Sequence, residues 1–438
     1  MTLLNFLEDD DMSGMKRNVV LALAIAAAVA TPAAFATNGY FQHGYGIKAQ
    51  GMGGAGIAFP QDAMAVATNP AGMVMVGDNM DFDLMYFSPN RETKLNSPGT
   101  ATGNYAANET SYFFIPEFAW NKLLDKKMSY GVAVYGNGGM NTTYSRNIPM
   151  FSGTMTDKAG VDLSQLFVAP NMAYKFTDTQ SVGASLIFAY QRFKADGLAN
   201  FDNASQSSAP GHVTNNGYDS STGWGVRLGW TGRVMPDVTL GATYQPKIKM
   251  GKFDKYKGLF AEQGEFDIPS NYGVGVAVKA MPKLTVAFDV EEIKYSDSKA
   301  VNNPLGPVSA FGVLQNTLGN NNGAGFGWQD ITVYKLGVSY QYSPSSTLRF
   351  GWNHNDQPIP ASQTFFNILA PGVVTDHVTL GGTWKLTKES ELSAMYAHAF
   401  SKEVKGSGSI PTAFQGYTKE ADLKMEQNSL SLGFGWNY

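Results

Sequence analysis

The sequence contains no cysteine, few histidines, little net charge and only one long apolar run. Its 438 residues include five His, and 32 Lys and Arg stand against 36 Asp and Glu. A chain without cysteine has no disulfides, no thiolate nucleophile and no cysteine-ligated metal. The near-neutral charge disfavours nucleic acid as a partner. We therefore expect no metal and no cofactor.

The one long apolar run belongs to a predicted signal peptide at residues 1–36. Lys16 and Arg17 precede the apolar residues 19–30, and Ala34-Phe35-Ala36 has the small-x-small form of a signal-peptidase site. We expect cleavage between Ala36 and Thr37. A membrane anchor or a buried helix is the alternative, but a membrane span needs about 20 apolar residues. Because the rest of the chain has no comparable run, a bundle of membrane-spanning helices is excluded.

Glycine and aromatic residues, in contrast, are abundant. The chain has 48 Gly, 27 Phe, 21 Tyr and 7 Trp. With a signal peptide and a mean hydropathy of −0.18, this composition is typical of a transmembrane β-barrel, in which only every second residue meets lipid. The C-terminal residues alternate strictly, with Ser, Gly and Asn on one face and the following apolar residues on the other: Leu430, Leu432, Phe434, Trp436 and Tyr438.

The same two-residue alternation predicts fourteen strands between residues 79 and 438, an even number as single-chain bacterial barrels have. The predicted strands contain residues 82–86, 113–120, 128–134, 166–176, 182–190, 224–230, 238–244, 272–278, 284–290, 334–340, 348–352, 378–384, 392–400 and 429–438. Tight polar turns alternate with long connections near residues 90–110, 137–160, 195–220, 296–325, 354–375 and 401–425. The sequence therefore predicts an all-β fold, a 14-stranded antiparallel transmembrane β-barrel. A soluble β-sandwich rarely needs so many strands in meander order.

Residues 37–78, ahead of the first strand, are rich in glycine and aromatic residues without strand or helix periodicity. A mobile tail is one interpretation. Apolar residues such as Ile57, Phe59, Met64 and Met73 are too numerous for a solvated tail. Since side chains cannot fill the lumen of so wide a barrel, we expect this segment to be a hatch, or plug, inside it.

The chain resembles the FadL family (FadL/TodX-like proteins), outer-membrane channels for long-chain fatty acids and aromatic hydrocarbons. The resemblance covers essentially all of the mature chain and rests on the order of several short motifs. These are Gly-Met-Gly-Gly-Ala-Gly at 51–56, Asp62-Ala63, the hatch motif Asn69-Pro70-Ala71, Gly-Trp-Gln-Asp at 327–330, Tyr-Lys-Leu-Gly at 334–337, Leu-Arg-Phe-Gly-Trp at 348–352 and Pro-Ile-Pro at 358–360. Two positions depart from the family: Asp376-His377 where Asp-Arg is usual, and Tyr438 where Phe is usual.

The resemblance implies passive uptake of hydrophobic molecules with lateral exit through the barrel wall at a kinked third strand. The hatch N-terminus offers Tyr40 and Phe41 as residues that line a ligand pocket, with plain packing of the hatch as the alternative. Alternation places Lys335, Arg349 and His377 on the lumen face, where a cation could bind a carboxylate ligand. Internal salt bridges or a merely polar lumen are the alternatives for these residues.

The kink is expected at Gly136, Asn137, Gly138 and Gly139, because glycine weakens a strand and tolerates a bulge. An ordinary loop entrance is the alternative for this cluster.

Two other functions remain open at this point. A general diffusion porin for small polar solutes would need an open, charged constriction. A lipase-type enzyme would need a catalytic constellation, for which His354 and Asp356 are the best candidates. The resemblance favours transport over both, with a hydrophobic small molecule as ligand. As partners of a monomeric protein in the bacterial outer membrane we expect membrane lipid, lipopolysaccharide and, through the C-terminal strand, the outer-membrane assembly machinery.

Overall fold

The computed structural model describes residues 37–96, 99–153 and 157–438, so the predicted signal peptide up to Ala36 lies outside the described residues. Within the described part, fifteen strands form one antiparallel sheet. The sheet closes on itself because β1 pairs with β15 from Asn79↔Asn437 to Leu95↔Ala421. Fourteen of the strands make the ring, and the short β2 pairs only with the outer end of β1. The predicted 14-stranded barrel is confirmed, with one additional strand.

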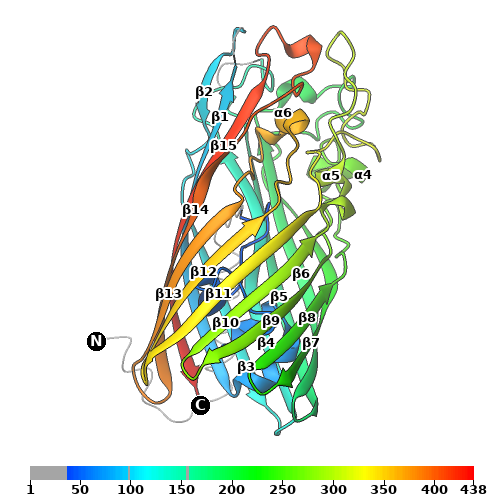
Figure 1. Cartoon of the computed structure of the whole chain (residues 1–438). Coiled ribbons are helices and arrows are strands. Elements are labelled where there is room, and N and C mark those ends of the chain that lie inside the picture. Colours follow the sequence, from blue (N-terminus) through cyan, green and yellow to red (C-terminus); the bar gives the residue numbers. More distant parts are fainter. Residues whose placement is uncertain (1–36, 97–98, 154–156) are drawn as a thin grey trace, which may run out of the picture.

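The strands of the barrel are long and strongly tilted (Figure 1). Their bounds are β1 (Asn79–Leu95), β2 (Gly103–Ala106), β3 (Phe113–Leu123), β4 (Met128–Thr143), β5 (Gly160–Thr177), β6 (Gln180–Asp196), β7 (Asp219–Met235), β8 (Val238–Gln245), β9 (Asn271–Met281), β10 (Leu284–Ile293), β11 (Ile331–Ser343), β12 (Ser346–Asn355), β13 (Asp376–Lys385), β14 (Ser390–Val404) and β15 (Ala421–Asn437).

The two ends of the barrel differ as the connection lengths predict. Turns of two to four residues join β3 to β4, β5 to β6, β7 to β8, β9 to β10, β11 to β12 and β13 to β14. The long loops lie at the other end, with the short helices α4 (Ala261–Gly264), α5 (Lys299–Asn302) and α6 (Thr364–Asn367) among them (Figure 1). Residues 246–270 form a further long loop that the sequence analysis missed. In bacterial barrels the long loops are extracellular.

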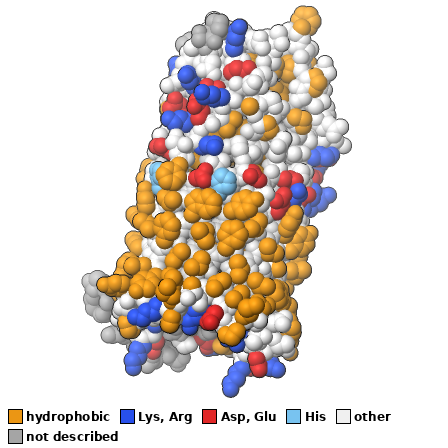
Figure 2. Space-filling view, in the orientation of Figure 1, with side chains coloured by type: hydrophobic (Ala, Val, Ile, Leu, Met, Phe, Trp, Pro, Cys, Tyr) orange, Lys and Arg blue, Asp and Glu red, His pale blue; other side chains and the backbone are white. Residues whose placement is uncertain are grey.

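The outer face of the barrel is apolar and the inner face is polar or small. On β1, Phe82 and Leu84 are exposed while Asp81 and Asp83 are buried. Figure 2 shows the exposed apolar side chains as a band around the lower part of the barrel, with charged side chains above and below it. This arrangement is the reverse of that in a water-soluble protein, and it is stable only where the apolar outer face contacts lipid. None of the helices in the described residues is long and apolar enough to cross a membrane.

Residues 37–78, here called the N-terminal segment, lie inside the barrel. The segment contains α2 (Ile47–Gln50), the 3₁₀ turns η2 (Ala63–Ala67) and η3 (Pro70–Gly72), and α3 (Met73–Val76). The side chains of Asp62 and Asn69 cap the two 3₁₀ turns, accepting from the backbone N–H groups of Met64 and Ala71 at 3.1 Å each. Most of the segment is buried, so the barrel wall covers the apolar residues that a solvated tail would expose.

Candidate functional site

A small apolar cavity lies between the long loops and the outer half of the barrel. Its volume is about 40 Å³, below the usual size range of small-molecule sites, so a larger ligand needs the lining side chains to move. Its lining is almost wholly apolar: Phe151, Val161, Phe193, Leu198, Phe201, Leu259, Phe260, Ala300, Leu318, Ala324, Gly325, Phe326, Phe366 and Leu369. Here this space is called the main cavity. Its wall is apolar and offers no side-chain charge to a ligand.

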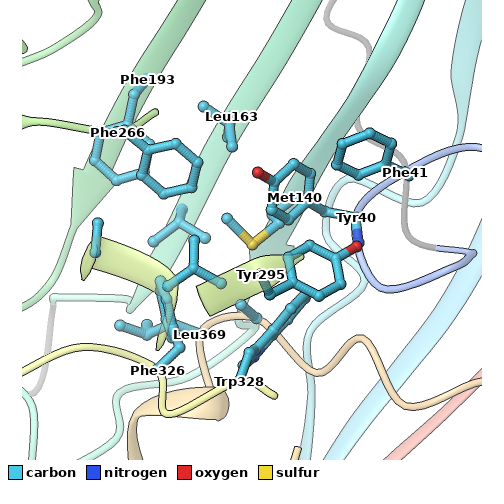
Figure 3. Close-up of a cluster of buried hydrophobic side chains, with 14 of the residues drawn as sticks. Tyr40, Phe41, Met140, Leu163, Phe193, Phe266, Tyr295, Phe326, Trp328 and Leu369 are labelled. Carbon is cyan, nitrogen blue, oxygen red and sulfur yellow. The ribbon is translucent and has the colours of Figure 1, made fainter. Parts of the chain in front are cut away.

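Tyr40 of the N-terminal segment belongs to the aromatic cluster next to the main cavity (Figure 3). Its ring centroid lies 5.2 Å from that of Tyr295, 6.0 Å from that of Trp328 and 6.0 Å from that of Phe266. The backbone N–H of Tyr40 donates to the Tyr295 hydroxyl at 3.1 Å. Burial raises the pKa of the Tyr40 phenol well above its usual value. Tyr40 is therefore a neutral, fixed element of the cluster.

A smaller cavity of about 10 Å³ adjoins the same cluster. Its lining residues are Arg91, Met140, Asn141, Trp328, Ala370, Pro371, Gly372 and Met425. The same two loops line both spaces, since Phe326 and Leu369 line the main cavity and Trp328 and Ala370 line the smaller one. Unlike the main cavity, this Arg91 cavity has a charged side chain in its wall.

The barrel wall has a gap in its hydrogen-bond ladder close to these cavities. β3 pairs with β4 only from Phe118↔Val134 to Leu123↔Ser129. In the described parts of both strands, residues 113–117 of β3 have no partner on β4, although they pair with β1. Pro116 lies in this unpaired stretch and has no N–H to donate. The hydrogen-bond ladder between β3 and β4 is thus interrupted on its extracellular side.

The glycines proposed for the kink lie at the edge of this gap, within a strand. β4 continues to Thr143, and its register with β5 shifts between Gly136 and Gly138, so that Asn137 forms a bulge. The alternative of a loop entrance does not describe this position. The bulge and the ladder gap occur together on the third strand of the ring.

The N-terminal segment takes the place of the missing strand contacts along this edge. Phe41 forms an isolated bridge with Gly138, and the N–H of Gly139 donates to the carbonyl of Tyr40 at 3.0 Å. The side-chain amide of Gln42 donates to the carbonyl of Gly136 at 2.6 Å. Residues 40–42 therefore stand between the cavities and the gap.

Buried carboxylates of the barrel hold the N-terminal segment in the lumen. Asp289 accepts from the N–H groups of Gly56 and Ile57 at 2.7 and 2.9 Å. Asp83 accepts from Ile47 N–H at 3.0 Å and Glu117 from Gly46 N–H at 2.9 Å. A hydrogen bond contributes about 0.5–1.5 kcal/mol, and up to about 3 kcal/mol where the acceptor is ionised. The segment is therefore tied to strands on several sides of the barrel.

The lumen cations suggested by alternation do point inward, but their partners are internal. Lys335 forms a 2.7 Å ion pair with Glu291. Arg349 donates to Gln61 at 2.8 Å and to Thr383 at 2.7 Å, and so contacts the N-terminal segment. Neither residue lines either cavity.

His377 lies on the inner face of β13, stacked on His43 of the N-terminal segment with ring centroids 5.9 Å apart. Burial, and to a lesser extent the charge of Lys335, lowers the pKa of His43 to about 4. Asn69 of the hatch motif donates to the carbonyls of Ile57 and Trp230 at 2.7 and 3.0 Å. These residues hold the segment together and attach it to the wall.

The residues considered for an enzyme are not brought together. His354 pairs with Asp376 at 2.8 Å, whereas a carboxylate oxygen of Asp356 accepts from Thr332 N–H. Within the described ranges no group of three His, Asp or Glu side chains could hold a metal ion.

Several residues of the site were missed by sequence reasoning. Tyr295 and Arg91 are separated from Tyr40 by long stretches of chain, and no local pattern links them. For Asp83, Glu117 and Asp289 a signal exists, because carboxylates on the inner face of a barrel strand need a partner. What the alternation cannot supply is the partner's identity, here the backbone of the N-terminal segment.

Residues 23–438 match one family model, described as Outer membrane protein transport protein (OMPP1/FadL/TodX). Similar solved structures include the P. putida toluene transporter TodX (TM-score 0.65, 17% identity), a Pseudomonas aeruginosa FadL homologue (0.68, 16%) and the Ralstonia pickettii toluene transporter TbuX (0.63, 18%). The three alignments cover 90%, 91% and 90% of this chain and 99% of each of the other chains. No curated protein matches the chain. The structural likeness at these identities establishes the fold.

Proposed function

The chain belongs to the OMPP1/FadL/TodX family of outer-membrane transport proteins, and from this membership we propose that it is a channel for passive uptake of hydrophobic molecules. Cargo enters among the long loops, binds in the main cavity and leaves sideways between β3 and β4 into the membrane. The single observation that carries the proposal is a small apolar cavity near a gap in the hydrogen-bond ladder of the wall, with residues 40–42 along the edge of that gap.

A lateral exit is favoured because it leads into lipid, whereas an exit along the barrel axis leads into water. An apolar molecule gains about 25 cal/mol for each Å² of surface it keeps out of water. Leaving through the wall delivers it to the membrane, whereas leaving along the axis would place it in water. The N-terminal segment also fills the lumen below the cavity, which disfavours an open pore for polar solutes.

In this proposal the N-terminal segment is a hatch, and Tyr40 and Phe41 connect pocket and gate. Tyr40 packs in the aromatic cluster through its ring and binds the edge of β4 through its carbonyl group. Cargo that displaces the ring therefore also disturbs the backbone contact that covers the gap. Gly136, Asn137, Gly138 and Gly139 form the gate edge.

Filling the main cavity tests the binding part of the proposal. Ala324→Trp places a large ring in the cavity that Ala324 lines, and it should lower toluene and dodecanoate uptake by cells at least about tenfold. Ala184→Trp, on the exposed outer face of β6, is the matched control and should transport normally. Normal uptake by Ala324→Trp, in a protein that still migrates as a folded barrel, would remove the main cavity from the route.

Deleting residues 40–46 tests the gate. Uptake should be lost while the barrel stays folded and heat-modifiable, because the pairing of β1 to β15 uses none of these residues. A deletion variant that transports normally would show that the pocket and the gate lie elsewhere.

A further inference from the structure

Residues 364–370, here called the α6 loop, form part of the wall of the main cavity. Phe366 and Leu369 of this loop line the cavity, together with residues of β5, β6 and other loops. At about 40 Å³ the cavity is smaller than an ordinary small-molecule site. A strand residue of the lining such as Val161 is held by ladders with both neighbouring strands, whereas loops are the more mobile parts of a fold. Cargo that enters must therefore displace lining loops, the α6 loop among them.

Two hydrogen bonds join the α6 loop to the far end of β4. Thr142 donates its hydroxyl to the carbonyl oxygen of Leu369 at 2.7 Å. The Tyr144 hydroxyl donates to the carbonyl oxygen of Ile368 at 2.6 Å, and it lies 2.8 Å from the hydroxyl of Thr93 on β1. All of these residues are buried, so a bond broken here is not replaced by one to water.

The part of β4 that these bonds hold is the part that borders the gap. Residues 138–143 pair with β5 on one side, but in the described parts of the two strands they have no partner on β3. The bulge at Asn137 separates them from the lower part of β4, which is paired on both sides. With one ladder in place of two, this end of β4 is held more weakly and can turn at the bulge.

The α6 loop is also tied to the aromatic cluster around Tyr40. The indole N–H of Trp328 donates to the side-chain oxygen of Asn367 at 2.5 Å, and the Trp328 ring lies 6.0 Å from that of Tyr40. Met140 of β4 and Leu369 belong to the same cluster of buried side chains (Figure 3). A movement of the loop therefore reaches both the N-terminal segment and β4.

We propose that Thr142 and Tyr144 couple the filling of the main cavity to the opening of the gap between β3 and β4. Cargo that enters the cavity displaces Leu369 and its neighbours in the α6 loop, and the two hydrogen bonds carry this displacement to residues 138–143. There it acts on the edge of β4 to which the N-terminal segment binds. The inference rests on the proposed function and assigns positioning residues for the exit step.

Hydrogen exchange of the purified full-length protein in lipid nanodiscs, with and without toluene, measures the coupling. Toluene should raise the exchange rate of the amides of residues 138–143 at least about threefold, because displacement of the α6 loop loosens their pairing with β5. The amides of β8, four strands away in the sheet, are the internal reference and should not change. Unchanged exchange at residues 138–143 in protein that binds toluene overturns the proposal.

Two substitutions that remove only hydroxyl groups should break the coupling. The double variant Thr142→Val, Tyr144→Phe should bind toluene within about threefold of the wild-type affinity, because neither side chain lines the main cavity. The effect of toluene on exchange should disappear, and toluene uptake by cells should fall at least about fivefold. Thr142→Ser, which keeps the hydroxyl, should behave as the wild type.

Tyr105→Phe combined with Thr418→Val is the matched control. Tyr105 is buried and donates its hydroxyl to the carbonyl of Ala101 at 2.8 Å. Thr418 is also buried and donates to the carbonyl of Asn96 at 2.9 Å. The control therefore removes the same two kinds of hydroxyl from bonds that join other parts of the extracellular end. It should bind and transport toluene as the wild type does, with the same effect on exchange.

The outcomes separate this inference from the proposed function. A double variant at positions 142 and 144 that keeps wild-type exchange and uptake overturns the inference. A double variant that loses toluene binding also overturns it, since the two hydroxyls would then only shape the cavity. In both cases the channel proposal stands as long as Ala324→Trp blocks uptake. If Ala324→Trp binds and transports toluene normally, the main cavity is not on the route, and the proposed function fails together with the inference.

Discussion

The carbonyl oxygen of Tyr40 occupies the space that a β-carbon on Gly138 would need. The two residues are 98 positions apart in the chain, yet the backbone of one fits against the bare α-carbon of the other, and the neighbouring Gly139 N–H donates to the same oxygen at 3.0 Å. A side chain at position 138 would therefore push the N-terminal segment away from the edge of β4.

The first prediction follows from this fit. Gly138→Val should lower both cargo uptake and the affinity of the main cavity for toluene, because displacing the Tyr40 carbonyl also moves the Tyr40 ring. Gly416→Val, at a loop glycine with nothing within 4 Å of an added β-carbon, is the control. A Gly138→Val protein that loses uptake but binds normally would show that the gate and the pocket are independent.

The second prediction concerns the carboxylates that hold the N-terminal segment. Asp289→Ala removes the acceptor of two backbone N–H groups and should loosen the segment by roughly 2–4 kcal/mol. Single-channel conductance in planar bilayers should then rise above that of the wild type, while Asp125→Ala, in an exposed turn, should change nothing. Unchanged conductance in Asp289→Ala would mean that the other carboxylates suffice.

The third prediction is that acid weakens the binding of the N-terminal segment inside the barrel, here called its docking. The pKa of His43 is about 4 in the docked segment, below the usual value of about 6.5. As pH falls from about 6.5 to about 4, His43 therefore takes up a proton in the undocked segment but not in the docked one. This difference weakens docking by at most about 3 kcal/mol. Docking is unaffected above this window.

Protease cleavage of the N-terminal segment, measured between pH 7 and 4, checks the effect. His43→Gln should flatten the acid response, and His212→Gln, in a loop, should keep it. If His43→Gln responds to acid as the wild type does, His43 is not the group whose titration weakens docking.

The fourth prediction is the start of the mature chain. Thr37 is buried, with its hydroxyl bound to the carbonyl of Phe41, and Ala34-Phe35-Ala36 precedes it. N-terminal sequencing of the protein from outer membranes should begin at Thr37. A start well outside residues 35–39 would refute the cleavage site.

The barrel could be predicted from the sequence because lipid and lumen impose opposite demands on successive residues. Phe82 and Leu84 alternate with Asp81 and Asp83, and this simple rule also placed Lys335 and Arg349 on the inner face. Strand ends were less predictable: β4 continues through Gly139 to Thr143 because its pairing with β5 persists beyond the bulge.

The candidate site could be predicted only in part. Tyr40 and the glycines near residue 138 stand out in the sequence, but their mutual fit depends on two backbones meeting inside the barrel. The gap between β3 and β4 has a single local signal in Pro116, and Arg91 looks like any charged residue near the end of a strand. The cavity lining comes from several loops, whose mutual arrangement no periodicity describes.

The N-terminal segment is bound by strands at both ends and in the middle of the sheet order. Asp83 binds it from β1 and Asp289 from β10, while Glu391 of β14 pairs with its Lys48. These groups surround one lumen only after β15 has joined β1. Contacts between residues distant in sequence carry a loop-closure cost that slows their formation. We therefore expect the N-terminal segment to dock only after the barrel has closed.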